Sequence, residues 1–150
     1  MWEIGYLMNE EGFVVGFTGT RTGMTKAQRE AVQRELAADG KDAPVIEFHH
    51  GDCVGADAQA HEIAVESKIS VFLHPPTGDK LRAFCESDFA YVPKPYLDRN
   101  KDIVNDTDYM LACPRGEETV RSGTWATIRY AVSKGKLVLI IYPDGRTEIK

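Results

Sequence analysis

The sequence predicts an α/β protein with a Rossmann-like three-layer sandwich, in which a mostly parallel sheet carries helices on both faces. Short apolar runs alternate along the chain with segments whose apolar residues recur at helical spacing. One run, residues 137–142, is almost wholly apolar, which is typical of a strand buried on both faces. With 150 residues, of which 43% are hydrophobic and 27% charged, the chain fits a single domain over residues 1–150.

The first strand is expected at residues 14–17, an apolar run that ends in Thr-Gly-Thr. Thr25, with Gln28 three residues later, matches a capping box, so a helix begins there and continues until Asp39-Gly40 stops the apolar pattern. Residues 45–48 form the next apolar run. The first 50 residues therefore predict a βαβ unit.

The same cycle then repeats. Apolar residues at helical spacing from Ala56 to Ala64 predict a second helix, and a strand at residues 69–73 is ended by Pro75-Pro76. Residues 77–95 carry only a weak pattern. Within them the stretch 84–89 fits a short helix or a structured loop, and both interpretations stay open.

The last part of the chain continues the alternation. A short helix at residues 98–104 leads to a strand at 109–113. The helical spacing from Trp125 to Val132 predicts the final helix, and the apolar run at 137–142 follows it as the fifth strand. Alternating apolar residues within 1–12 suggest an extra edge strand.

The charge pattern argues against a nucleic-acid partner. The net charge is −5 at pH 7, and the 18 Lys and Arg residues are scattered without forming a basic stripe. No segment approaches the length of a transmembrane helix, and the N-terminal segment lacks the basic stretch of a secretory signal. The 3 cysteines form no C-x-x-C pair, which favours a reducing compartment. We therefore expect a cytoplasmic protein with no membrane partner.

Ligands of open α/β sheets bind outside the carboxyl ends of the strands, so the loops after the strands are the candidate site. The first loop, residues 18–23, has the sequence TGTRTG, in which glycines permit close backbone approach while hydroxyls and one guanidinium supply donors. It matches neither the G-x-G-x-x-G nor the Walker pattern. This composition predicts a phosphate at a helix N-terminus, although a solvated loop fits it equally well.

The second loop, residues 50–57, again leads from a strand into a helix. Gly51 and Gly55 are candidates for backbone close to a ligand, while Asp57 in the first helical turn complements the helix dipole. His49 and His50 have no third ligand at a helpful spacing, so no metal site is predicted and both are expected to form local hydrogen bonds.

Two further segments complete the candidate site. Arg99 and Asn100 place a guanidinium beside an amide, a pairing suited to phosphate or ribose hydroxyls, although a charged surface explains it as well. Residues 121–124, with the sequence RSGT, begin the last helix and bring an arginine and two hydroxyls to its free N–H groups. This segment has the strongest anion-binding pattern in the chain.

The segments TGTRTG, HHGDCVGADAQAHEIA, RNKDIVNDTDYMLACP and RSGTWATIRYAVSKGKLVLIIYPDG together resemble successive blocks of the SLOG superfamily, and its YspA-like branch most of all. The resemblance runs from about residue 14 to residue 142. It implies a Rossmann-like domain that binds a nucleotide or a NAD-derived nucleotide, such as a cyclic ADP-ribose type signal. The candidate ligand-binding residues are Gly19, Thr20, Arg21, Thr22, Gly51, Asp52, Gly55, Ala56, Asp57, Arg99, Asn100, Arg121, Ser122, Gly123 and Thr124.

The related LOG-type phosphoribohydrolases cleave nucleoside monophosphates with a P-G-G-x-G-T-x-x-E block. Gly123 and Thr124 align with its G-T, and Thr127 then stands at the glutamate position. A hydroxyl does not replace a carboxylate in stabilising an oxocarbenium-like centre or activating water. We therefore expect a binding protein that senses or sequesters its ligand, with no catalytic residue, cofactor or metal. A phosphoribohydrolase is the alternative, and an interaction scaffold is a third interpretation.

Association of the chain with itself is also expected. Similar proteins commonly form dimers, and aromatic residues in two parts of the chain are candidates for exposure. These residues are Trp125 and Tyr130 on the final helix, and Tyr91 and Tyr96 in the unassigned segment and at its end, although a core position fits Trp125 equally well.

Overall fold

The structure, a computed structural model, describes residues 12–37 and 43–150. The strands of these residues are β1 (Phe13–Gly19), β2 (Val45–His50), β3 (Ser70–Leu73), β4 (Phe89–Ala90), β5 (Tyr109–Cys113), β6 (Leu137–Ile141) and β7 (Thr147–Ile149). The helices are α2 (Lys26–Leu36), α3 (Ala56–Glu66), α4 (Tyr96–Asn105) and α5 (Gly123–Ser133). All strands join one sheet in the order β4-β3-β2-β1-β5-β6-β7.

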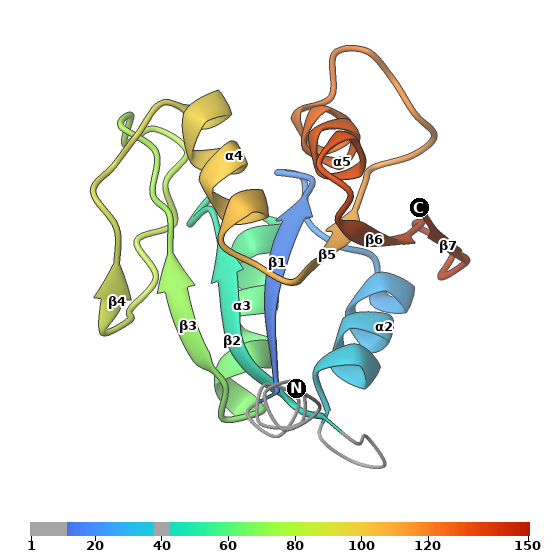
Figure 1. Ribbon diagram of the computed structural model, residues 1–150, viewed down its shortest axis with the longest axis horizontal. Coiled ribbons are helices and arrows are strands. Elements are labelled where there is room, and N and C mark those ends of the chain that lie inside the picture. The colour runs from blue at the N-terminus through green and yellow to red at the C-terminus, as the bar shows by residue number, and fades with distance from the viewer. Residues whose placement is uncertain (1–11, 38–42) are drawn as a thin grey trace, which may run out of the picture.

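The sheet is parallel from β4 to β6, and only β7 pairs with its neighbour in the antiparallel sense. Helices α2 and α3 pack on one face, and α4 and α5 pack on the other (Figure 1). Each face has its own core, the first including Phe17, Phe48 and Leu111 and the second including Ile128 and Ile140. The predicted three-layer α/β sandwich is therefore confirmed.

The capping box predicted at the start of α2 is present and also ties two strands together. The side chain of Thr25 accepts a hydrogen bond from the Gln28 amide at 3.1 Å, and the Gln28 side chain accepts one from the Thr25 amide at 3.0 Å. The Nε2 of Gln28 donates to the carbonyls of Pro114 and Ile141, both at 2.9 Å. One buried side chain thus caps a helix and bridges the ends of β5 and β6.

Two short strands were not predicted. β4 lies in the segment 77–95, which had no assignment, and β7 follows the Pro143-Asp144-Gly145 turn as a polar edge strand. Val132 was expected on the buried face of α5 but is 44% exposed. The edge strand suggested for residues 1–12 falls, except for Gly12, outside the described residues. No helix among the described residues is both long and apolar enough to cross a bilayer.

The strand order places the candidate site. From β1 the chain proceeds outward through β2, β3 and β4 on one side, and then returns to β5 and β6 on the other side of β1. The order therefore reverses between β1 and β5. Crevices at such a reversal, outside the carboxyl ends of the strands, are where open α/β sheets bind ligands.

Candidate functional site

A cleft of about 900 Å³ lies at this reversal. Its floor comes from the end of β1 and from the loop after β2, one wall comes from the first turns of α4, and the other wall comes from residues 115–122 and the start of α5. Twelve of the predicted site residues line it. They are Gly19, Thr20, Arg21, Thr22, Gly51, Asp57, Arg99, Asn100, Arg121, Ser122, Gly123 and Thr124. Asp52, Gly55 and Ala56 are not among the lining residues.

The loop after β1 is a tight turn held by its own hydroxyls. The Oγ1 atoms of Thr20 and Thr22 lie 2.9 Å apart, and the Thr22 amide donates to Thr20 Oγ1 at 3.3 Å. The Gly23 amide donates to the Thr20 carbonyl at 3.2 Å. Arg21 lies at the exposed tip of this turn and forms no ion pair with any described residue. Its guanidinium is therefore available to a ligand.

Gly55 and Gly19 hold this turn against α3. The Ala56 amide donates to the Thr20 carbonyl at 3.0 Å, and Gly55 has a φ of +91°. A Cβ on Gly55 would lie 2.2 Å from the Arg21 carbonyl oxygen, and a Cβ on Gly19 would lie 2.6 Å from the Ala56 Cβ. Gly19 was expected to serve ligand access, but the contact with Ala56 shows that close packing also requires a glycine there.

Arg99 is a buried residue at the floor of the cleft. Its Nη1 donates to the carbonyls of Gly51 and His74, its Nη2 donates to Cys53 Sγ at 3.4 Å, and its Nε donates to Asn100 Oδ1. The guanidinium has five N–H groups, so these four bonds leave at most one for a ligand. Arg99 therefore contributes mainly positive charge and a fixed floor.

Asp57 is the buried carboxylate of the cleft. It is 6% exposed, and its Oδ2 accepts a hydrogen bond from the Cys53 amide at 3.2 Å. Burial raises the pKa of Asp57 from 3.8 to about 6, against the opposing effects of Arg99 and of the amides of Cys53 and Gly51. A carboxyl with this pKa exchanges its proton near neutral pH, which is a property of acid–base groups as well as of buried structural acids.

Asp52 has a structural position away from the cleft lining. It is fully buried, with a φ of +54°. Its Oδ2 accepts from Arg82 Nε and its Oδ1 accepts from the Cys85 amide, both at 2.8 Å. The Ala83 amide donates to the Asp52 carbonyl at 2.8 Å. This residue therefore anchors the segment 82–85 to the end of β2.

The first turn of α5 presents free amides. Ser122 caps the helix, its Oγ accepting from the Trp125 amide at 3.2 Å. The amides of Gly123 and Thr124 have no acceptor within the described residues. A Cβ on Gly123 would meet no atom within 4 Å, so the backbone there is open. Two N–H groups at a helix N-terminus thus face the cleft, an arrangement that favours an anion.

The wall at residues 115–122 carries two arginines without ion pairs. Glu117 and Glu118 also line the cleft, but each pairs with an arginine from another element at 2.9 Å. Arg115 and Arg121 are exposed and form no ion pair among residues 12–37 and 43–150. The acidic charge of this wall is therefore neutralised, and its unpaired charge is positive.

The position of Thr127 does not fit a catalytic role, and the position of Trp125 does not fit a surface role. Thr127 is 3% exposed, donates to the Gly123 carbonyl at 3.0 Å, and does not line the cleft. Trp125, which was considered as an exposed aromatic, is 2% exposed, and its Nε1 donates to the Gly116 carbonyl at 3.2 Å. It belongs to the core and holds the 115–122 wall.

Sequence reasoning missed several lining residues. Arg115 lies two residues after the end of strand β5, so the rule that ligands bind after strands would have found it. Tyr96 and Leu97 line the cleft because α4 begins two residues before the expected helix start. Cys53 lies within the second candidate loop but was not among the predicted site residues.

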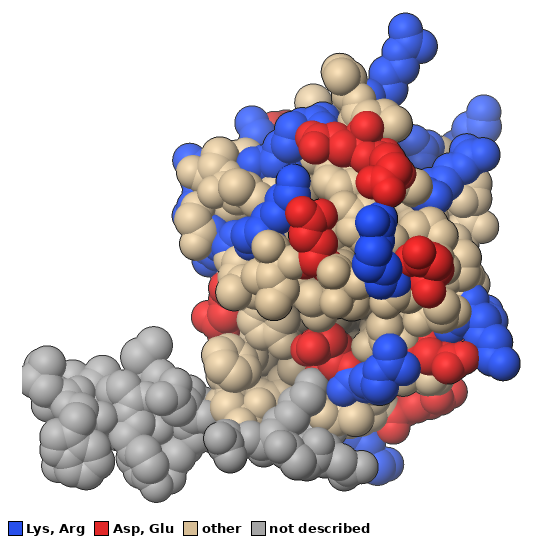
Figure 2. Space-filling model, turned by 90° about the vertical axis from the view of Figure 1, so that its right-hand side faces the viewer, with Lys and Arg blue, Asp and Glu red and all other residues tan. Residues whose placement is uncertain are grey.

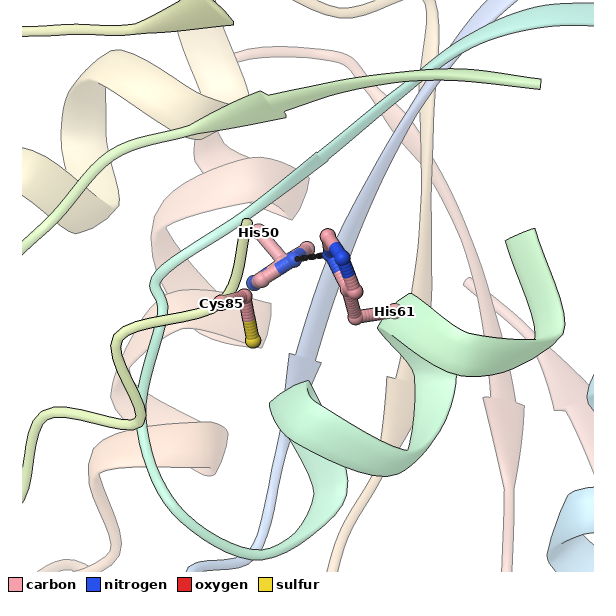
Figure 3. Close-up of side chains that lie close together, drawn as sticks. All are labelled: His50, His61 and Cys85. Carbon is pink, nitrogen blue, oxygen red and sulfur yellow. Dashed lines mark hydrogen bonds between the residues drawn. The ribbon is translucent and has the colours of Figure 1, made fainter. Parts of the chain in front are cut away.

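His49 and His50 form local hydrogen bonds, as expected. Nδ1 of His49 lies 2.8 Å from Nε2 of His74, and Nε2 of His50 lies 2.9 Å from Nδ1 of His61. Figure 3 shows the His50–His61 pair with Cys85 beside it, a group whose ligand atoms lie within 4.8 Å of one another. The other nitrogen of His50, Nδ1, accepts from the Asp52 amide at 3.0 Å, so both ring nitrogens are used inside the protein. Burial lowers the pKa of His50 well below its usual value, and the ring is neutral.

The surface charge agrees with a small anionic ligand more than with an extended polyanion. On the face that Figure 2 shows, basic and acidic side chains are interspersed, so this side carries no continuous basic stripe. Three arginines without ion pairs among the described residues, Arg21, Arg115 and Arg121, line the cleft.

No protein-family model matches the chain, and no curated protein matches it. Several solved structures are similar to it. The molybdenum cofactor binding protein of Rippkaea orientalis is similar with a TM-score of 0.66 at 20% identity, over 87% of this chain and 77% of that one. The molybdenum cofactor carrier protein of Chlamydomonas reinhardtii has a TM-score of 0.60 at 16% identity, over 86% and 76% of the two chains. A third structure, called TM1055, has a TM-score of 0.58 at 16% identity, over 83% and 71%. At these identities the similarity establishes a shared Rossmann-like fold.

Proposed function

We propose that this protein binds a nucleotide or a NAD-derived nucleotide metabolite, such as a cyclic ADP-ribose type signal, in the cleft between α4 and α5. One observation carries the proposal: Arg21, Arg115 and Arg121, none of them ion-paired within the described residues, line the same cleft as the free amides at the start of α5. Guanidinium groups and helix N-termini are strong partners of phosphate. The volume of about 900 Å³ suits a ligand of nucleotide size.

Two of the structurally similar proteins are named for binding or carrying a cofactor, which supports a small-molecule ligand for this fold. The resemblance of the loops to the SLOG superfamily supports the nucleotide class. The protein then acts as a sensor that works with a partner, or as a protein that sequesters the ligand. Neither role requires a glutamate at position 127.

A second candidate function is hydrolysis of a nucleotide glycosidic bond, and Asp57 favours it. This carboxyl is buried at the cleft floor and its pKa is raised to about 6, so it can hold or release a proton near pH 7. Asp52 does not offer the same chemistry because Arg82 and the Cys85 amide occupy its carboxylate.

The test uses the purified protein. Calorimetric titration with nucleoside monophosphates, NAD, ADP-ribose, cyclic ADP-ribose and a molybdenum cofactor preparation measures affinity, and mass spectrometry of the same mixtures detects products. Saturable binding of a nucleotide that is recovered intact supports the proposed binder. Multiple turnovers that are lost in Asp57→Asn support the hydrolase. Binding of no nucleotide, or of the molybdenum cofactor alone, contradicts both.

A further inference from the structure

We propose that the α4 wall is a subsite for a planar heterocyclic ring, so that the cleft takes a ligand whose ring and phosphate contact opposite walls. This inference rests on the proposed function and assigns the ring of the nucleotide to one wall of the cleft, a contact that inorganic phosphate and sugar phosphates cannot make. It begins from the difference in chemistry between the two walls.

The α4 wall is apolar and exposed. Tyr96 is 39% exposed and Leu97 is 67% exposed, and both line the cleft at the first turn of the helix. Ile103 of the same helix, which is 2% exposed, also lines the cleft. The opposite wall holds Arg115, Arg121 and the free amides of α5. A ligand that satisfies both walls needs an apolar face and an anionic end.

The Tyr96 ring is positioned as a stacking platform. The guanidinium carbon of Arg99 lies 5.1 Å from the ring centroid, and that of Arg21 lies 5.9 Å from it. Arg99 is buried and its bonds to the carbonyls of Gly51 and His74 fix its position, so it supports the ring from inside the protein. A base that stacks on this tyrosine leaves the Arg99 contacts intact and takes the place of Arg21, an exposed residue that forms no ion pair with any described residue.

Asn100 supplies polar recognition beside the ring. Its Oδ1 accepts the hydrogen bond from Arg99 Nε, which fixes the orientation of the amide. The Nδ2 group then carries two N–H donors, and no described residue accepts from it. A ring nitrogen, a carbonyl or a ribose hydroxyl of the ligand can accept these bonds. The α4 wall thus combines a stacking face with fixed donors, which a base or nucleoside satisfies and a bare phosphate does not.

The experiment compares adenosine monophosphate with ribose 5-phosphate, which lacks the ring, by calorimetry on the full chain. We expect the wild type to bind adenosine monophosphate about tenfold or more tightly than ribose 5-phosphate, the gain typical of base–aromatic stacking. Tyr96→Leu should remove about that tenfold gain for adenosine monophosphate and leave ribose 5-phosphate unchanged. Tyr96→Phe should retain the wild-type preference. Tyr130→Leu, a tyrosine of α5 outside the cleft lining, is the matched control and should also retain it.

Equal affinities of the wild type for the two ligands would overturn the subsite, and so would wild-type affinity of Tyr96→Leu for adenosine monophosphate. The wild-type comparison decides the matter alone if Tyr96→Leu does not fold. Failure of both ligands to bind contradicts the proposed phosphate site itself, which is a different result from binding without a ring preference.

Discussion

Arginine serves two purposes around the cleft, and burial separates them. Arg99 is 6% exposed and uses its N–H groups on protein atoms, so it stabilises the floor. Arg21 and Arg121 are exposed at the rim. From the sequence, all three arginines were predicted to bind the ligand, because the sequence does not show which guanidinium is buried. Likewise, Asp52 and Asp57 were both predicted to bind the ligand. Asp52 is structural because it pairs with Arg82, which is 30 residues away in a segment whose sequence carries only a weak pattern.

Arg121→Ala should weaken nucleotide binding about 10- to 100-fold, because one charge-assisted hydrogen bond contributes about 1.5–3 kcal/mol. The thermal midpoint should stay at the wild-type value because Arg121 is exposed and forms no ion pair within the described residues. Arg34→Ala, which removes an arginine from the last turn of α2, is the control and should bind normally. Wild-type affinity in Arg121→Ala would place the phosphate elsewhere.

Asp57 should make the folded protein less stable as the pH rises. Its pKa is raised from 3.8 to about 6 in the folded state, so the folded state holds the proton more tightly than the unfolded state. The stability linked to this proton is fully present below pH 4 and is lost as the pH rises through 6, with a magnitude of roughly 2–3 kcal/mol.

Denaturant unfolding of the wild type and Asp57→Asn at pH 4, 5, 6 and 7 tests this. The variant has no titrating group at position 57. Its free energy of unfolding should therefore increase relative to that of the wild type as the pH rises from 4 to 6. A difference that stays constant over this range would show that Asp57 titrates normally.

At the scale of elements, apolar runs and helical spacing predicted β1, β2, β3, β5 and β6 and all of the described helices. These elements are buried on regular faces, and regular burial leaves a periodic signal. β4 is a two-residue strand and β7 is a polar strand of three residues, too short or too exposed to leave one. The loops after the strands were identified as the site, but the wall from α4 depended on a helix start that the sequence placed two residues late.

Gly19→Ala should lower the free energy of unfolding by about 1–3 kcal/mol, the typical result of overpacking. The new methyl would lie 2.6 Å from the Ala56 Cβ and 3.0 Å from the Phe17 ring, so β1 and α3 would have to separate. Gly123→Ala is the control, since its methyl would meet no atom within 4 Å, and it should melt like the wild type. Wild-type melting of Gly19→Ala would contradict the packing described here.

At the scale of the whole molecule, exposed apolar side chains occur at β4, the edge strand of the sheet, and directly after it. The exposed fractions are 45% for Phe89, 45% for Tyr91 and 79% for Val92. Trp125 is buried and Tyr130 is partly buried, so the expected self-association depends on this edge and not on α5. Exposed apolar clusters of this kind are typical of interaction sites.

We expect light scattering at micromolar concentration to give a mass of about twice 16.7 kDa. Val92→Glu, which places a charge in the cluster, should give the monomer mass. Val120→Glu changes a valine that is 89% exposed on the other side of the cleft, and it should not alter the mass. A wild-type mass near 16.7 kDa, with and without nucleotide, would exclude the dimer.

The bonds that join the loops beneath the cleft also affect the entropy of binding. The Ala56 amide already contacts the Thr20 carbonyl, and Arg99 already connects the carbonyls of Gly51 and His74. A ligand that settles on this floor has few backbone dihedrals left to order, so the loss of conformational freedom falls mainly on the ligand and on the arginine side chains at the rim. Affinity in such a site depends on how much of the ligand's own motion is frozen, which favours compact or cyclic molecules over long flexible ones.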